Sequence, residues 1–198
     1  MDNSLFRVLL LSGSLRYPSH TYTNLKYLEG LLRKRGVSTH LWDLFSDPLP
    51  IHNPEYHRNP HANKFEVVRR LAHLADLADA FVWGTPVYHD SFSGILKNAL
   101  DNLNSHQFHH KPVALISNGG MRSSTEPCDQ LRIVAHGLLA IAIPTQVVTA
   151  DSDFEYFQGR FVIVNPLIDD SFARLTEELI AYSISLRQLR ERPEPHRV

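Results

Sequence analysis

The chain has 198 residues, 43% of them hydrophobic, which is enough for one sizeable core and predicts a single domain. Its 20 basic and 21 acidic residues nearly cancel, and this balance argues against nucleic acid or an anionic membrane surface as the main partner. The lone cysteine excludes an internal disulfide and the N-terminus is unlike a signal peptide, so we expect a cytoplasmic protein without membrane spans.

Strand and helix patterns alternate along the chain. The first half predicts a strand at 6–11, a helix at 19–34, a strand at 37–42, a long loop at 43–63, a helix at 65–77 and a strand at 79–84. The second half predicts a helix at 93–103, a strand at 112–117, a helix at 125–140, a strand at 144–149, a short extra strand at 161–164 and a helix at 169–189. Residues 191–198 are expected to form a frayed tail.

Alternation of apolar strands with helices predicts an α/β fold with three layers, in which helices cover both faces of a parallel sheet. Five such units fit a doubly wound sheet with strand order 2-1-3-4-5, formed by one domain over residues 1–190. In sheets of this kind the ligand lies beyond the carboxyl ends of the strands, near strands 1 and 3. The loops that follow the strands are therefore the places to look for a site.

The loop after the first strand carries hydroxyls and one arginine but no acid. Ser14, Ser19 and Thr21 surround Arg16, and no Asp or Glu occurs from residue 6 to residue 28. A helix N-terminus adds unpaired N–H groups, and a guanidinium can hold two oxygens of one phosphate, so the loop indicates a phosphate site. The glycine-rich nucleotide motifs are missing, which favours a terminal phosphate monoester such as that of FMN. The alternative is that these hydroxyls are ordinary caps and turns and Arg16 a surface arginine.

Two further loops follow the third and fourth predicted strands. The segment 85–88 (TPVY) is a stiff, extended turn that exposes backbone groups beside one aromatic ring. Gly119 and Gly120 let the backbone approach a flat ligand closely. Each loop alone could be an ordinary connection, but three compatible loops at neighbouring strand ends favour a flavin ring.

These segments resemble the NADPH-dependent FMN reductase family, which has a flavodoxin-like fold. The family motif G-S-x-R-x-x-S-x-[S/T/N] reads GSLRYPSHT at 13–21. The motif P-x-Y, followed by L-K-N-x-x-D, occurs at 86–88 and 96–101, and the motif S-x-G-G occurs at 117–120. The segments YPSHTYT and HLWDL look most similar to the alkanesulfonate-utilisation type of flavin reductase within this family.

The resemblance implies a role for each matching residue. The residues expected to hold the FMN phosphate are Ser14, Arg16, Ser19 and Thr21. Those expected to border the ribityl chain and the ring are Pro86, Val87 and Tyr88. The other side of the ring would meet Ser117, Asn118, Gly119 and Gly120. The resemblance also implies a homodimer or homotetramer and, as a further partner, an enzyme that accepts reduced flavin.

The implied reaction passes hydride from NADPH or NADH to N5 of FMN, and electrons then go to free flavin, a quinone, an azo dye or a metal oxyanion. The flavin does this chemistry, so we expect no side chain to act as a catalytic acid or base. Three alternatives stay open: a flavodoxin-type electron carrier, a non-catalytic flavin-binding protein, and a specialised-pathway flavoenzyme with a pocket formed by 43–63. Carriers tend to be strongly acidic, whereas this chain has a pI of about 6.9.

Histidine, cysteine and charged residues outside these motifs give weaker evidence of a functional role. Three histidines at 106, 109 and 110 have no carboxylate or cysteine at ligand spacing, so we expect no metal site. Cys128 is expected to be a small, half-buried residue, and Lys97 and Asp101 a pair on one helix face. Arg122 is expected to be solvated, with a dinucleotide phosphate as its alternative partner.

Overall fold

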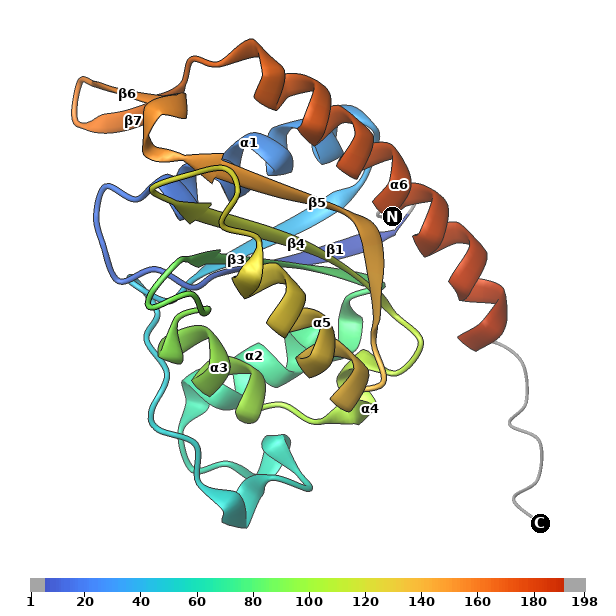
Figure 1. Ribbon diagram of the computed structural model, residues 1–198. Coiled ribbons are helices and arrows are strands. Elements are labelled where there is room, and N and C mark those ends of the chain that lie inside the picture. Colours follow the sequence, from blue (N-terminus) through green and yellow to red (C-terminus); the bar gives the residue numbers. More distant parts are fainter. Residues whose placement is uncertain (1–5, 191–198) are drawn as a thin grey trace.

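A parallel five-stranded sheet forms the centre of the fold in the computed structural model, which describes residues 6–190 (Figure 1). Residues 1–5 and the predicted tail at 191–198 lie outside the described residues. The strands are β1 (Arg7–Ser12), β2 (Ser38–Asp43), β3 (Ala80–Pro86), β4 (Pro112–Gly119) and β5 (Ile141–Ala150). Their order is β2-β1-β3-β4-β5 and all pairs are parallel, so the predicted flavodoxin-like sheet is confirmed.

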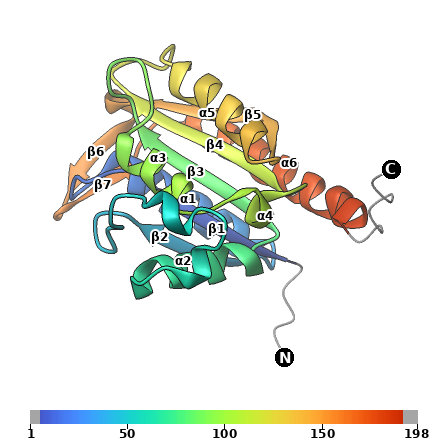
Figure 2. The same ribbon diagram turned by 90° about the horizontal axis from the view of Figure 1, so that it is seen from below.

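Helices cover both faces of the sheet and make the fold three layers thick (Figures 1 and 2). One face carries α1 (His20–Lys34) and the long α6 (Pro166–Arg190). The other face carries α2 (Glu66–Leu77), α3 (Gly94–Asp101), the short α4 (Ser105–Phe108) and α5 (Glu126–Gly137). Because both faces are covered, successive residues in the middle of β1 are all apolar, which explains the uninterrupted run from Val8 to Leu11 in the sequence.

Two hydrophobic clusters fill the layers between sheet and helices. Leu9, Leu11 and Trp83 point into the cluster under α2, α3 and α5. Leu10 and Val82 point into the cluster under α1 and α6. Successive strand residues alternate between the two clusters, so the sheet holds its strand ends in fixed positions on a core buried from both sides.

Strand β5 and the segment after it differ from the sequence prediction. β5 begins at Ile141 rather than at residue 144, because an irregularity in its pairing with β4 accommodates Pro144. Arg132 donates to the carbonyl oxygens of Ile143 and Pro144, both at 2.8 Å, at this irregularity. The extra strand predicted at 161–164 is one arm of an antiparallel hairpin formed by β6 (Phe154–Phe157) and β7 (Arg160–Ile163).

The histidine-rich loop at 43–63 is anchored on α3. Asn98 donates from Nδ2 to the carbonyl oxygen of Pro50 at 3.0 Å and accepts from the backbone N–H of His52 at 2.8 Å. Asn102 donates to the same carbonyl oxygen at 3.2 Å. The loop contains two short 3-10 helices, at Pro54–Tyr56 and Pro60–Ala62, and contributes no side chain to the cavity described below.

Candidate functional site

Loops from four strand ends surround a cavity of about 350 Å³ at the carboxyl edge of the sheet. Its lining residues are Ser14, Arg16, Pro18, Ser19, His20, Thr21, Pro86, Val87, Tyr88, Asn118, Gly119, Gly120, Asp151 and Phe161. The lining includes every predicted site residue except Ser117, which is fully buried in β4 on the same face as Leu115. The fold therefore brings together three sequence motifs that lie far apart along the chain.

The loop after β1 starts in a tightly packed position. The N–H of Gly13 donates to the carbonyl oxygen of Gly84 at 2.8 Å, and Ser93 donates from Oγ to the carbonyl oxygen of Gly13 at 2.6 Å. A Cβ at Gly13 would lie 2.8 Å from both the Gly84 oxygen and the Leu96 Cβ. The glycine of the first motif is therefore needed to bring this loop against β3 and α3.

The hydroxyls of this loop serve the backbone and still face the cavity. Ser14 Oγ accepts from the N–H of Arg16 at 3.2 Å, and Ser19 Oγ caps α1 by accepting from the N–H of Tyr22 at 3.3 Å. A hydroxyl that accepts a hydrogen bond keeps its own hydrogen for donation. The cap-and-turn role and an anion-binding role are thus compatible, since Ser14 and Ser19 are buried with a donor left over.

Arg16 adds a positive charge at the same end of the cavity. Its side chain is exposed and, within residues 6–190, no carboxylate forms an ion pair with it. The first N–H groups of α1 point the same way, and an α-helix offers these groups no internal acceptor. This end of the cavity therefore presents the donor set of an anion site.

The opposite end of the cavity is formed by the loops after β3 and β4. The N–H of Val87 donates to the carbonyl oxygen of Asn118 at 2.8 Å, which ties the two loops together. A Cβ at Gly119 would lie 2.9 Å from Val87 Cγ2, whereas a Cβ at Gly120 would meet open space. The glycines keep this wall thin and expose backbone groups, as a flat ligand requires.

A tight turn follows Tyr88. Tyr88 and Ser91 exchange backbone hydrogen bonds at 2.9 and 3.0 Å, and His89 and Asp90 between them have φ values of 50° and 57°. Two consecutive positive φ angles define a turn that twists with the flanking chain, and Asp tolerates this conformation better than most residues. Gln130 of α5 donates to the carbonyl oxygen of Asp90 at 2.8 Å, so the turn beside Tyr88 is held in place.

Sequence reasoning missed the wall formed by His20, Asp151 and Phe161. The loop after β1 carries no acid, but the carboxylate of Asp151 reaches the same cavity from the segment after β5. Asp151 follows β5 and pairs with His20, with 3.0 Å between Oδ1 and Nδ1. Asp151 could have been found by the rule that strand ends converge, since it directly follows a strand. Phe161 carried no such signal, because it reaches the cavity only through the β6–β7 hairpin.

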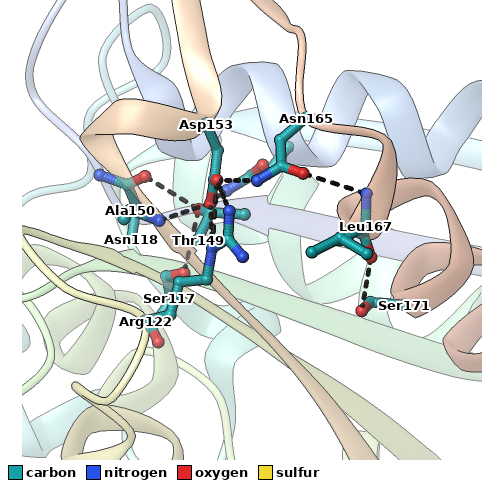
Figure 3. A network of polar contacts seen from close by, with 10 residues as sticks. Ser117, Asn118, Arg122, Thr149, Ala150, Asp153, Asn165, Leu167 and Ser171 are labelled. Atoms are coloured by element: carbon teal, nitrogen blue, oxygen red, sulfur yellow. Dashed lines mark hydrogen bonds and ion pairs between the residues drawn. The ribbon is translucent and has the colours of Figure 1, made fainter.

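A buried carboxylate holds the segments after β4 and β5 together (Figure 3). Asp153 has a fully buried side chain and accepts from Arg122 Nε at 3.1 Å, from the N–H of Ala150 at 2.9 Å and from Asn165 Nδ2 at 2.7 Å. Arg122 is exposed as expected, with 41% of its side chain accessible, but its guanidinium is also paired with Asp153, which the sequence did not predict. The pair holds the loop after β4, in which Arg122 is two residues from Gly120.

The structure confirms one further side-chain expectation. Lys97 Nζ lies 2.6 and 2.8 Å from the carboxylate oxygens of Asp101, so the predicted helix-face pair is confirmed. Within residues 6–190, no group of three or more His, Cys, Asp or Glu side chains could hold a metal ion. Over the same residues, none of the helices has the length and apolar character that a membrane span needs.

Cys128 is more deeply buried than predicted, and we expect its thiol to be unreactive in the folded protein. Burial raises the pKa of Cys128 to about 11, so the reactive thiolate is nearly absent at pH 8. An aromatic disulfide reagent at pH 8 should modify the native chain only at the rate of unfolding. Addition of guanidinium chloride should release one thiol per chain at once, and rapid labelling of the native chain would contradict the buried position.

The lining of the cavity fits FMN in the chemistry of its donors. Hydroxyls, a guanidinium and a helix N-terminus at one end suit a phosphate monoester. Backbone amides, two glycines and Tyr88 at the other end suit the polar edge and faces of an isoalloxazine ring. A second cavity of about 550 Å³ lies beside the first and shares Pro18, Ser19 and Phe161 with it.

Comparisons with known proteins agree with this interpretation. A family profile described as NADPH-dependent FMN reductase matches residues 6–155. An FMN-dependent NADPH-azoreductase of Staphylococcus saprophyticus is 37% identical over 161 residues, which cover 79% of this chain and 84% of the relative. An enzyme of the same description from Staphylococcus aureus (strain USA300) is 40% identical over 149 residues, covering 74% and 78% of the two chains.

The fold also resembles that of solved flavoenzymes. The NAD(P)H:(acceptor) oxidoreductase FerB of Paracoccus denitrificans superimposes with a TM-score of 0.68 at 22% identity, covering 93% of this chain and 98% of FerB. This likeness concerns the fold alone, whereas the profile covers most of the chain, including all three motifs and β1 to β5. The chain therefore belongs to the NADPH-dependent FMN reductase family.

Proposed function

We propose that this chain carries electrons from NADPH through FMN to small organic acceptors, and that azo compounds are among them. Membership of the family makes the chain an FMN-dependent NAD(P)H oxidoreductase. The observation that carries the proposal is the convergence of three family motifs on one cavity, with an anion-binding end and a glycine-walled end. The azo acceptor is suggested by the two azoreductases described above.

Each end of the cavity has its own task in this proposal. Bound FMN would supply hydride acceptance at the flavin N5, chemistry that no side chain can provide. Ser14, Arg16, Ser19 and Thr21 would hold the phosphate through charge-assisted hydrogen bonds. The backbone hydrogen bond between Val87 and Asn118 keeps two walls at a fixed separation, and the exposed amides there would stabilise negative charge on the reduced ring.

The remaining site assignments are part of the same proposal. Pro86, Val87 and Tyr88 would border the ribityl chain and one side of the ring. Asn118, Gly119 and Gly120 would face the other side, and Ser117 would act from within β4 through its backbone. One domain over residues 1–190 would carry the whole activity. We place it in the cytoplasm, where a lone thiol such as Cys128 stays reduced.

The resemblance to alkanesulfonate-utilisation reductases would imply an electron acceptor other than an azo compound. Such an enzyme would release reduced flavin to a partner, whereas an FMN-dependent reductase of azo compounds would use FMN as a cofactor that stays bound. The two differ in how FMN behaves during turnover: as a substrate it shows a Michaelis constant, and as a resident cofactor it copurifies and saturates at one equivalent per chain. We propose the resident cofactor in a homodimer or homotetramer.

Anaerobic reduction tests the proposed activity. The purified chain with one equivalent of FMN should lose its visible flavin absorbance after NADPH is added, and an azo dye admitted next should restore the absorbance as it is decolourised. FMN that binds but is not reduced by NADPH would instead support an electron carrier or a non-catalytic flavin protein. No decolourisation after full reduction would exclude the azo acceptor and leave the reductase.

A further inference from the structure

His20 occupies a constrained position in the wall of the cavity. It is the first residue of α1, directly after the capping Ser19, and its side chain is only 20% exposed. The imidazole stacks on Phe154 with ring centroids 4.3 Å apart and contacts Phe161 at 3.9 Å. These contacts with the β6–β7 hairpin fix the plane of the ring, so its two nitrogens point in defined directions.

One ring nitrogen is committed to a carboxylate. His20 Nδ1 lies 3.0 Å from Asp151 Oδ1, and Asn118 Nδ2 donates to the same oxygen at 3.0 Å. Asn118 is oriented in turn, because its Oδ1 accepts from Thr149 Oγ1 at 2.8 Å. The carboxylate oxygen of Asp151 can only accept, which favours a hydrogen on His20 Nδ1 directed at it. Nε2 has no hydrogen-bond partner within residues 6–190 and is left for the cavity.

The charged groups around His20 allow a dianion to bind beside the ring. The charged groups that face the ring are Asp151, from the turn after β5, and Arg16, from the loop after β1. The hairpin presents uncharged rings, and β4 presents an amide. Burial lowers the pKa of His20 below its usual value, Asp151 opposes this effect and Arg16 adds slightly to it. In the free protein near pH 7, the imidazole is therefore mostly neutral.

We propose that His20 is a further ligand of the FMN phosphate and that it donates a hydrogen bond from Nε2 as the imidazolium, held by Asp151. This inference rests on the proposed function, since it needs FMN in the cavity. The proton on Nε2 comes from solvent when FMN binds, while Nδ1 keeps its hydrogen bond to Asp151. FMN binding is then coupled to the uptake of up to one proton per chain.

The direction of the pH dependence follows from linkage. A phosphate dianion beside the ring favours the imidazolium, so the pKa of His20 is higher in the complex than in the free chain. Between these two pKa values the complex holds more protons than the free protein, and the dissociation constant rises with pH by up to tenfold per unit. Protonation of the phosphate itself, with a pKa near 6, acts in the opposite direction, so the titrations begin at pH 6.5.

Binding titrations from pH 6.5 to 8.5 test the proposal, with flavin fluorescence as the readout. For FMN we expect the dissociation constant to rise several-fold across this range. For riboflavin, which lacks the phosphate, we expect no change. In His20→Gln the FMN value should be raised at pH 6.5 and independent of pH, whereas His73→Gln, at an exposed position of α2, should keep the wild-type slope.

Calorimetry in two buffers of different ionisation enthalpy measures the proton directly. At pH 7 we expect an uptake approaching one proton per FMN for the wild type and close to none for His20→Gln. Asp151→Asn provides an independent variant should the loss of the buried ring impair folding, because the Asp151 side chain is 67% exposed. Without the Asp151 carboxylate, the pH range over which the FMN dissociation constant changes should move to lower pH.

Two results would overturn this inference alone: FMN binding without proton uptake, or an equal slope for riboflavin and FMN. The same slope in His20→Gln as in the wild type would overturn it as well. A wild-type chain that binds no FMN at any pH would overturn the proposed function and this inference together, so the two failures are distinguishable.

Discussion

Replacement of Arg16 by alanine is expected to raise the dissociation constant for FMN about 10- to 100-fold, since hydrogen bonds to a charged group contribute about 1.5–3 kcal/mol. The guanidinium is exposed at the anion-binding end of the cavity and forms no ion pair within residues 6–190, so its removal should leave folding intact. Riboflavin should bind Arg16→Ala and the wild type equally. Fluorescence titration with both flavins measures the difference.

Arg174→Ala is the matched control, because this arginine is exposed on α6, outside both cavities. It should bind FMN as the wild type does. Equal losses for FMN and riboflavin in Arg16→Ala would show that Arg16 shapes the cavity rather than recognising a phosphate. Unchanged FMN affinity would leave the hydroxyls of Ser14 and Ser19 as caps and turns only.

Replacement of Arg122 by alanine is expected to lower the free energy of unfolding by about 3 kcal/mol. The substitution leaves the fully buried Asp153 carboxylate without its counter-charge, and breaking such a pair costs about 3–5 kcal/mol. We expect the lower end because the Arg122 side chain is 41% exposed and two neutral donors, Ala150 N–H and Asn165, still serve the carboxylate. Urea denaturation measures the change.

The variant Arg122→Ala/Asp153→Asn separates loss of the pair from loss of packing. An uncharged amide no longer needs a counter-charge, so the double variant should be more stable than Arg122→Ala. Compared with the two single variants, Arg122→Ala and Asp153→Asn, it should show a coupling energy of about 1–3 kcal/mol. If the loss of unfolding free energy in the double variant equals the sum of the losses in the two single variants, the ion pair contributes nothing to stability. FMN affinity should fall in Arg122→Ala even when the chain is folded, because the pair holds the loop in which Gly120 lies two residues before Arg122.

Strands and helices were predicted best where the sequence pattern within the segment itself was enough to identify them. The buried strands were found because parallel strands covered on both faces carry continuous apolar runs, as at Val8–Leu11 in β1 and Ala80–Trp83 in β3. The hairpin β6–β7 was only half found: Phe154–Phe157 mixes exposed aromatic and charged residues, and no period distinguishes it from a loop. The start of β5 was missed because Pro144 suggests a boundary, whereas Arg132 satisfies the carbonyl oxygens around the irregularity.

The sequence by itself determined which segments approach the ligand. A motif such as GSLRYPSHT encodes its own conformation, since Gly13 allows close packing and Ser19 caps the helix that it begins. Parallel topology then brings the loops after β1, β3 and β4 to one edge, wherever they stand along the chain. The conformation of the loop and the convergence of the strand ends follow from local sequence and from topology, so neither requires knowledge of side-chain contacts.

Only the tertiary structure decided how the charges in and around the cavity are partnered. His20 meets Asp151, and Arg122 meets Asp153, although the partners lie far apart along the chain. These residues stand at the start of α1 and in the segments after β4 and β5, so the folded positions of these segments decide which side chains meet. The energy of an ion pair depends on distance and burial, which are properties of the folded chain. Residue types alone therefore did not predict that Asp151 meets His20 in the cavity wall or that Arg122 pairs with Asp153.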